Sequence, residues 1–260
     1  MSEDRKMKKS KKINKKQLYI AVVIVLIFSL GLFFIFRKPS VTPGIEYVKK
    51  MEKEKVETVA KKLHEKRVDE LMDAIDKGRL DTFAMFDDYA FFGDSRTMGF
   101  STYGFLPSST ILAGSGHTIL NIPNWIETIK NLQPSTLYFS YGVNDMGLKI
   151  DSYEGGYKGV YEEKVKSILE VCPDAEVFII SIIQPSTETL EDNPSWREYK
   201  NYNKQIKEMC KENNWHYIDC TSLAKDGKAD IYQSDGIHYL RDFYEVWAKK
   251  IIEDTMEVLA

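Results

Sequence analysis

Short apolar runs alternate with stretches of helical periodicity over residues 81–260. The apolar runs predict five strands, at 89–92, 110–113, 136–141, 176–183 and 216–220. The periodic stretches predict helices at 122–132, 156–171, 196–213 and 242–259. Because a parallel strand requires a crossover, which is usually a helix, the alternation predicts a parallel sheet with helices on both faces. We therefore expect an α/β domain of flavodoxin-like, three-layer α/β/α architecture over 81–260.

The N-terminal pattern is different and predicts a membrane anchor. Residues 18–36 form a run of 19 without a charge, and a helix of that length approaches the ~30 Å hydrocarbon core of a bilayer. A cleaved signal peptide is the alternative, but the run exceeds the usual ~7–15-residue apolar region and no small-x-small cleavage site follows it. Eight basic residues precede the run, whereas Arg37 and Lys38 follow it. This bias predicts a single-pass cell-membrane protein with a cytoplasmic tail at 1–17 and an extracytoplasmic domain.

Residues 39–80 are expected to form a linker and a helical stalk. A short segment with Pro43 and Gly44 leads into residues 45–78, which contain no proline and no glycine before Gly78. Apolar residues recur there at near-helical spacing, but the stripe is narrow and its register slips between Leu63 and Val68. A stalk-mediated homodimer, packing along the following domain and simple spacing from the membrane all fit this pattern.

Charge and cysteine content exclude several classes of function. The part of the chain after the apolar run and its two flanking basic residues has 26 Lys and Arg against 37 Asp and Glu. A surface of that net charge repels nucleic acid. Cys172, Cys210 and Cys220 match no zinc or redox motif and are interpreted as small buried residues without a disulfide. With no metal-binding motif and no glycine-rich phosphate loop, we expect no metal and no cofactor.

Residues suited to chemistry follow the predicted strands or lie in the last loop. They are Ser95 in "GDSRT", Gly114 and Gly116 in "AGSGH", Asn144 in "GVND", and Asp235 and His238 in "DGIH". Because chemistry in such sheets gathers at the carboxyl ends of the strands, we expect these motifs at one edge. Each motif alone is common: a serine after a strand is frequently a helix N-cap, and an asparagine is frequent in turns.

A serine hydroxyl attacks an ester only when a base takes its proton, and the usual base is a histidine oriented by a carboxylate. The chain has four histidines. Asp235 lies three residues before His238 on a glycine-containing loop, so its carboxylate can hold one ring nitrogen while the other faces a nucleophile. The Asn144 amide can donate to the oxyanion of a tetrahedral intermediate, and glycine at 114 or 116 lets a backbone N–H approach the same atom.

Taken together, these motifs resemble those of the SGNH/GDSL hydrolase family, over roughly residue 86 to the C-terminus. The resemblance implies that Ser95 is the nucleophile, Asp235 the orienting acid and His238 the general base. It also implies an oxyanion hole made by the Ser95 N–H, Asn144 and Gly116, the last preferred over Gly114.

The first motif departs from the family pattern, because "GDSR" replaces "GDSL". Arg96 beside the nucleophile indicates an anionic or polar substrate, or an ion pair with Asp87 or Asp88. Asp94 is expected to brace the turn. Gly114 and His117 are further possible substrate contacts, although His117 has no nearby carboxylate in the sequence and suits an ordinary loop residue.

These features predict a membrane-anchored, extracytoplasmic serine esterase acting on acyl esters. The resemblance to the family implies that O-acetyl esters of cell-envelope carbohydrate are the leading substrates. The alternative is an O-acyltransferase of cell-wall polysaccharide that uses the same triad. A contrasting hypothesis is a non-catalytic envelope module that binds glycan or a partner through the same pocket.

Overall fold

The computed structural model describes residues 14–36, 43–52, 55–227 and 229–259. It divides into two compact units, Met1–Val59 and Ala60–Ala260. The predicted basic tail up to residue 13 and the linker at 37–42 lie outside the described residues.

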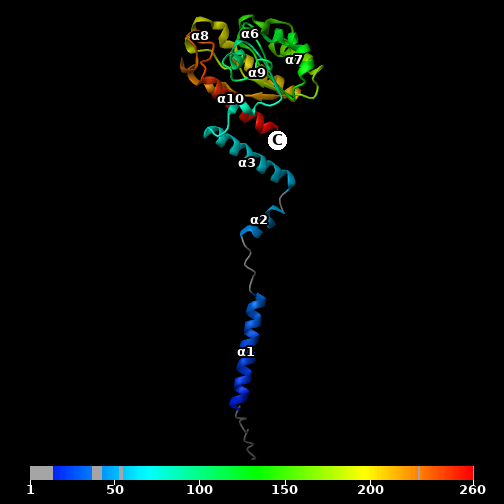
Figure 1. Cartoon of the computed structure of the whole chain (residues 1–260), viewed down its shortest axis with the longest axis vertical. Helices are drawn as coiled ribbons and strands as arrows, with labels where there is room; N and C mark the ends of the chain where they lie inside the picture. Colours follow the sequence, from blue (N-terminus) through cyan, green and yellow to red (C-terminus); the bar gives the residue numbers. More distant parts are fainter. Residues whose placement is uncertain (1–13, 37–42, 53–54, 228, 260) are drawn as a thin grey trace, which may run out of the picture. The chain divides into compact units, whose positions relative to one another are not determined.

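The first unit contains helices α1 (Lys15–Phe36) and α2 (Pro43–Met51), labelled in Figure 1. Helix α1 covers the apolar run at 18–36. Within the described part of the chain, however, no helix reaches both the length and the apolar character that crossing a membrane requires. The prediction of a membrane span is therefore not confirmed.

The predicted stalk is described as two helices, because α2 ends at Met51 and α3 covers Val56–Asp76. Residues 53 and 54 lie outside the described residues. Most of α3 belongs to the second unit, where Val68 and Met72 are buried. Asp76 forms an ion pair there with Lys249 of α10 (Phe243–Val258). The domain therefore begins before residue 81, and the C-terminal half of the expected stalk is part of it.

A five-stranded parallel sheet forms the centre of the second unit. Its strands are β1 (Tyr89–Gly93), β2 (Ile111–Ala113), β3 (Thr136–Ser140), β4 (Glu176–Ile180) and β5 (His216–Ile218). Their order is β2-β1-β3-β4-β5, and every neighbouring pair is parallel. This is the flavodoxin-like order. The order in which strands are added to the sheet reverses between β1 and β3, and such a switch point leaves a crevice at the carboxyl ends of these two strands. The predicted α/β fold with five parallel strands is confirmed.

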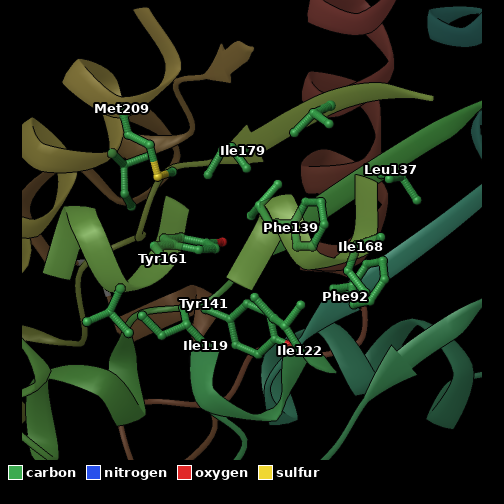
Figure 2. Packing of buried hydrophobic residues seen from close by; sticks show 14 of the residues in the cluster. Phe92, Ile119, Ile122, Leu137, Phe139, Tyr141, Tyr161, Ile168, Ile179 and Met209 are labelled. Carbon is green, nitrogen blue, oxygen red and sulfur yellow. The ribbon is translucent and has the colours of Figure 1, made fainter. Parts of the chain in front are cut away.

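Side chains alternate between two cores, one on each face of the sheet. Phe92 and Phe139 stack with ring centroids 4.5 Å apart and pack with Ile122, Tyr161 and Ile168 (Figure 2). The neighbouring strand residues face the other core, where they pack against α4 (Ser95–Thr102) and α10. The strands are therefore buried on both faces, which explains their continuous apolar runs.

Helices connect and cover the strands. They are α4 (Ser95–Thr102), α5 (Ile126–Leu132), α6 (Val143–Gly147), α7 (Gly156–Leu169), α8 (Thr187–Asp192), α9 (Tyr199–Asn213) and α10 (Phe243–Val258). Short 3₁₀ segments lie at Thr82–Met85, Ile119–Trp125, Ile150–Ser152, Pro194–Glu198, Thr221–Gly227 and Ala229–Ile231. The four predicted helices correspond to α5, α7, α9 and α10, the first and third entered through 3₁₀ turns. The three cysteines are buried free thiols.

Strand β4 ends at Ile180, three residues before the predicted end at 183, because a side chain of α9 takes the place of a strand partner there. The side chain of Asn203 accepts the Ile182 N–H at 2.7 Å and donates to the Ile182 carbonyl at 2.9 Å. Asn203 is buried and thus replaces a neighbouring strand as the hydrogen-bond partner of this segment. The apolar residues up to Ile183 remain buried without belonging to the sheet.

Two helical glycines allow a matched test of the packing between α4 and α10. A methyl group at Gly99 would lie 1.8 Å from Tyr244 Oη, whereas one at Gly159 of α7 would meet no atom within 4 Å. We expect Gly99→Ala to lower the free energy of unfolding by about 1–3 kcal/mol because of overpacking. Gly159→Ala should raise it by up to about 1 kcal/mol through helix propensity. Urea denaturation of the full chain in detergent measures both, and equal stabilisation by the two substitutions would contradict the packing.

Candidate active site

The turn after β1 presents Ser95 and leaves its hydroxyl available. At Gly93 no side chain fits, because a methyl group would lie 2.0 Å from Thr97 Oγ1. Asp94 is the N-cap of α4, and its carboxylate accepts the Arg96 N–H at 2.8 Å. Burial raises the pKa of Asp94, although the charge of Arg96 opposes that shift. Since Asp94 braces the turn and caps the helix, Ser95 is not needed as a cap.

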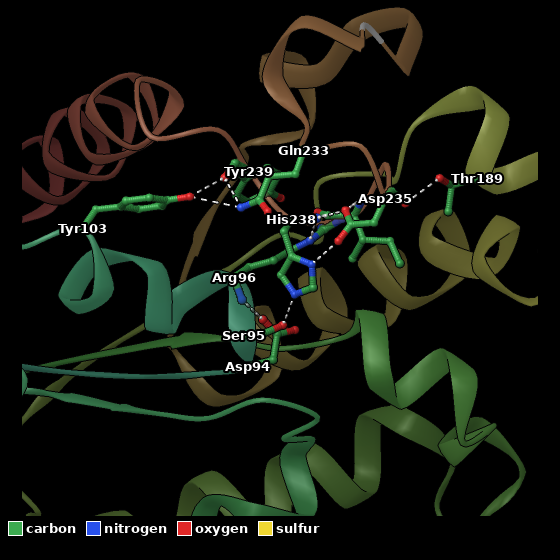
Figure 3. A network of polar contacts seen from close by, with 10 residues as sticks. Asp94, Ser95, Arg96, Tyr103, Thr189, Gln233, Asp235, His238 and Tyr239 are labelled. Carbon is green, nitrogen blue, oxygen red and sulfur yellow. Dashed lines mark hydrogen bonds and ion pairs between the residues drawn. The ribbon is translucent and has the colours of Figure 1, made fainter.

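Ser95, His238 and Asp235 form a hydrogen-bonded series (Figure 3). The distance from His238 Nε2 to Ser95 Oγ is 2.8 Å, and that from His238 Nδ1 to Asp235 Oδ2 is 2.6 Å. The other oxygen of Asp235 accepts the backbone N–H groups of Ile237 and His238 at 2.8 and 3.0 Å. The structure thus brings together three side chains that the sequence separates by up to 143 positions.

The ionisation of Asp235 decides which ring nitrogen of His238 carries a proton. Partial burial raises the pKa of Asp235, whereas the hydrogen bonds from His238 and from the two backbone N–H groups lower it. The hydrogen bonds together have the larger effect, so the pKa of Asp235 lies below its ordinary value. An ionised carboxylate only accepts, so His238 Nδ1 carries a proton. In the neutral imidazole, Nε2 is then an acceptor facing the Ser95 hydroxyl.

Arg96 is buried and contacts the backbone of the loop that carries His238. Its side chain is buried, with the residue 4% exposed. The guanidinium donates through Nε to the Ile237 carbonyl at 2.9 Å and through Nη1 to the Ile183 carbonyl. It also lies 4.7 Å from the centre of the Tyr239 ring. No ion pair joins it to Asp87 or Asp88 among the described residues, and the contact of Arg96 with a polar or anionic substrate stays a prediction.

The contacts of Arg96 give it a positioning role. Ile237 lies between Asp235 and His238, and Tyr239 follows the histidine directly. The residue next to the nucleophile therefore holds the backbone of the loop that carries the other two members of the series. A guanidinium suits this place because it remains charged when buried and presents several donors in a fixed plane.

The segments after β2 and β3 are joined by two adjacent side chains of α6. Asn144 Nδ2 donates to the His117 carbonyl at 2.9 Å, and Asp145 Oδ1 accepts the Ile119 N–H at 2.9 Å. Asp145 is fully buried, and burial raises its pKa to about 7. Sequence reasoning chose Asn144 and missed Asp145, whose only signal is its place beside Asn144 at the end of a buried strand.

The glycine loop after β2 is a tight turn. The His117 N–H donates to the Gly114 carbonyl at 3.2 Å, and Gly116 occupies the third position with φ +72°. A positive φ at that position is typical of a type II turn and favours glycine. The His117 ring packs against Gly114, because a methyl group there would lie 2.5 Å from His117 Nε2. Gly116 and His117 thus lie on the loop that Asn144 holds.

The part of the chain that the structure describes contains no group of three or more His, Cys, Asp or Glu side chains arranged to hold a metal ion.

Comparison with known families identifies the domain. The sequence profile of the GDSL-like lipase/acylhydrolase family matches residues 91–246, which include Ser95, Asp235 and His238. The chain belongs to this family. As a GDSL-like acylhydrolase it is a serine ester hydrolase, and the non-catalytic alternative is set aside. The resemblance to SGNH/GDSL hydrolases expected from the motifs is confirmed.

Solved structures share the fold at low sequence identity. A protein from Bacteroides fragilis proposed to be an acylhydrolase is 18% identical with a TM-score of 0.50, covering 65% of this chain and 87% of its own. A variant of an acetyl-xylooligosaccharide esterase from Geobacillus is 18% identical with a TM-score of 0.50, covering 64% of this chain and 92% of its own. At these identities the similarity shows the fold alone. No curated protein matches the sequence.

Arg96→Met removes the guanidinium donors while keeping a long apolar stem. We expect kcat for p-nitrophenyl acetate to fall by up to about 100-fold, with a smaller change in KM. The reason is that a shift of about 1 Å in the position of a catalytic group such as His238 can lower the rate by that factor. Arg96→Lys should retain part of the rate. Arg241→Met is the matched control, because Arg241 is exposed and its guanidinium lies 4.5 Å from the centre of the Phe105 ring. An unchanged kcat in folded Arg96→Met would contradict the positioning role.

Proposed function

We propose that the protein is a membrane-anchored, extracytoplasmic serine esterase that removes acyl groups, above all acetyl groups, from cell-envelope carbohydrate. The observation that carries the catalytic part is the series from Ser95 Oγ through His238 to Asp235, with contacts of 2.8 and 2.6 Å. This is the arrangement in which a serine hydroxyl becomes a nucleophile at neutral pH.

In the proposed reaction, Ser95 Oγ attacks the acyl carbonyl carbon while His238 Nε2 takes the hydroxyl proton. Asp235 holds the imidazole and stabilises the imidazolium. The tetrahedral intermediate collapses when His238 gives its proton to the leaving alcohol, and an acyl-enzyme remains. Water then attacks that ester with His238 as base, and the carboxylic acid leaves as Ser95 regains its proton.

The oxyanion formed in both steps needs N–H donors. We assign the Ser95 backbone N–H, the Gly116 backbone N–H and Asn144 Nδ2 to this role. Asn144 uses one of its two amide hydrogens on the His117 carbonyl, and the second remains for the oxyanion. The same contact holds the loop with Gly116, so two donors are arranged together before substrate arrives, and preorganised donors of this kind contribute most to catalysis.

Solvent access favours hydrolysis over transfer to a sugar. The side chains of His238 and Asp235 are 38% and 43% exposed. An acyltransferase must keep water away from its acyl-enzyme, whereas an esterase admits it. We therefore propose water as the acceptor, and O-acyl transfer to polysaccharide is the alternative outcome.

Acetylated carbohydrate is the proposed substrate class. The Geobacillus protein with this fold is named as an acetyl-xylooligosaccharide esterase, and its substrate supplies a practical probe. The acidic balance of the chain after the apolar run favours an uncharged polymer over nucleic acid.

The membrane anchor is proposed from the sequence, on the 19 uncharged residues at 18–36 and the basic residues before them. In bacterial cells the full chain should sediment with membranes, and external protease should reach its C-terminal domain in spheroplasts. A variant with Val25→Asp and Ile27→Asp should lose the membrane fraction. Recovery of the unchanged chain in the soluble fraction would contradict the anchor.

Ser95→Ala tests the assignment of the nucleophile. We expect loss of labelling by a fluorophosphonate probe and a fall of about 10⁴-fold or more in acetate release from acetylated xylooligosaccharides. Ser101→Ala is the matched control, because Ser101 lies in the same helix and donates only to the Met98 carbonyl. If folded wild-type protein shows neither labelling nor turnover, the proposal fails, and acetate appearing on an added glycan would indicate transfer.

A further inference from the structure

A cleft of about 530 Å³ lies beside the acid of the catalytic series. One wall is formed by α8 and the residue before it, and the other is the loop that carries Asp235. Its lining includes Ser186, Glu188, Thr189, Asp192, Gln233 and Asp235. The reaction described above uses only Asp235 from this set, so the cleft has no role in the chemical steps.

The two walls of the cleft are joined by hydrogen bonds. The Ser186 N–H donates to the Gly236 carbonyl at 2.8 Å, and Thr189 Oγ1 donates to the Asp235 carbonyl at 3.1 Å. Ser186 Oγ donates to Thr189 Oγ1 at 2.8 Å. Figure 3 shows Ser95, His238, Asp235 and Thr189 in succession. The cleft is therefore held at a constant position at the acid end of the series.

The direction of the reaction places one part of the substrate on this side. The oxyanion must face Asn144, and the leaving alcohol oxygen must face His238 Nε2, because that nitrogen gives it a proton. The alcohol part of an ester bound at Ser95 thus extends along the His238 side of the site. In an acetylated oligosaccharide this part consists of the sugar residues, and Asp235 is common to the site and the cleft.

We propose that the cleft is the subsite for the alcohol part of the substrate and that it binds sugar residues next to the acylated one. This inference rests on the proposed function and adds a binding site to it. A cleft of this volume accommodates a sugar unit, since ligand sites in proteins measure about 300–1,000 Å³.

The lining also defines the chemistry of the ligand. Ser186 Oγ donates to Thr189 Oγ1 and accepts the Thr189 N–H, and Thr189 Oγ1 donates to the Asp235 carbonyl. Each hydroxyl oxygen therefore keeps one lone pair for a donor and has no hydrogen left to donate. Glu188 and Asp192 are exposed carboxylates without an ion pair among the described side chains. An acceptor-rich wall binds the O–H donors of neutral sugars, or an amine, and repels uronate and phosphate groups. The subsite therefore selects glycans without negative charge.

The double variant Glu188→Gln and Asp192→Asn keeps the shape of the cleft and removes two charges. We expect kcat/KM for a neutral acetylated xylooligosaccharide to fall about 10-fold, mostly through KM, because a hydrogen bond to a carboxylate is stronger than one to a neutral amide. The rate for p-nitrophenyl acetate should remain unchanged, since this ester has no sugar. Glu191→Gln is the matched control, because Glu191 is exposed on the same helix and does not line the cleft.

Three measurements on the full chain distinguish the outcomes. The ratio of kcat/KM for an acetylated uronate-containing glycan to kcat/KM for the neutral substrate should be higher in the double variant than in wild type. Calorimetry with Ser95→Ala should show binding of the deacetylated xylooligosaccharide, weakened about 10-fold by the double substitution. Failure of p-nitrophenyl acetate turnover in wild type would overturn the proposed function, whereas unchanged oligosaccharide kinetics and binding in the double variant would overturn the subsite.

Discussion

The hydrogen bond between Ser95 and His238 joins segments 143 positions apart, and the rest of the site depends on it. It forms because two different structural constraints meet at the crevice of the sheet. Strand β1 ends in a turn that directs the serine outward, and the loop before α10 returns to the same edge with the histidine. The parallel sheet places the first group, and the packing of α10 on one face of that sheet places the second.

The loop that carries Asp235 and His238 is held by contacts from two segments. Arg96, beside Ser95, donates to the carbonyl of Ile237, and the hydroxyl and N–H groups at the start of α8 contact the carbonyls of Asp235 and Gly236. The Tyr239 ring packs against the Arg96 guanidinium. These contacts act mainly on the backbone, so they leave the side chains of Asp235 and His238 exposed for reaction. A site can thus be rigid and still open to water.

Acidic groups have different roles at different depths in this domain. Asp94 and Asp145 are buried, and each accepts a backbone N–H that maintains a turn near the site. Burial raises the pKa of both carboxyls. Asp235 is more exposed and has a lowered pKa, which suits a carboxylate that must stay ionised beside an imidazole. Glu188 and Asp192 lie at the surface, where charge influences which ligands approach.

The sequence by itself determined the sheet and the nucleophile motif, because both depend on local patterns. Buried parallel strands require continuous apolar runs, and the five runs were recognised in their correct places, while the motif around Ser95 identified the family. Only the tertiary structure decided where β4 ends, since that end depends on Asn203 of α9. It also decided that Arg96 contacts the loop that carries His238, that α3 belongs partly to the domain, and that a cleft lies beside Asp235. Each of these features depends on contacts between residues that are far apart in the sequence, and a local pattern of residues does not predict such contacts.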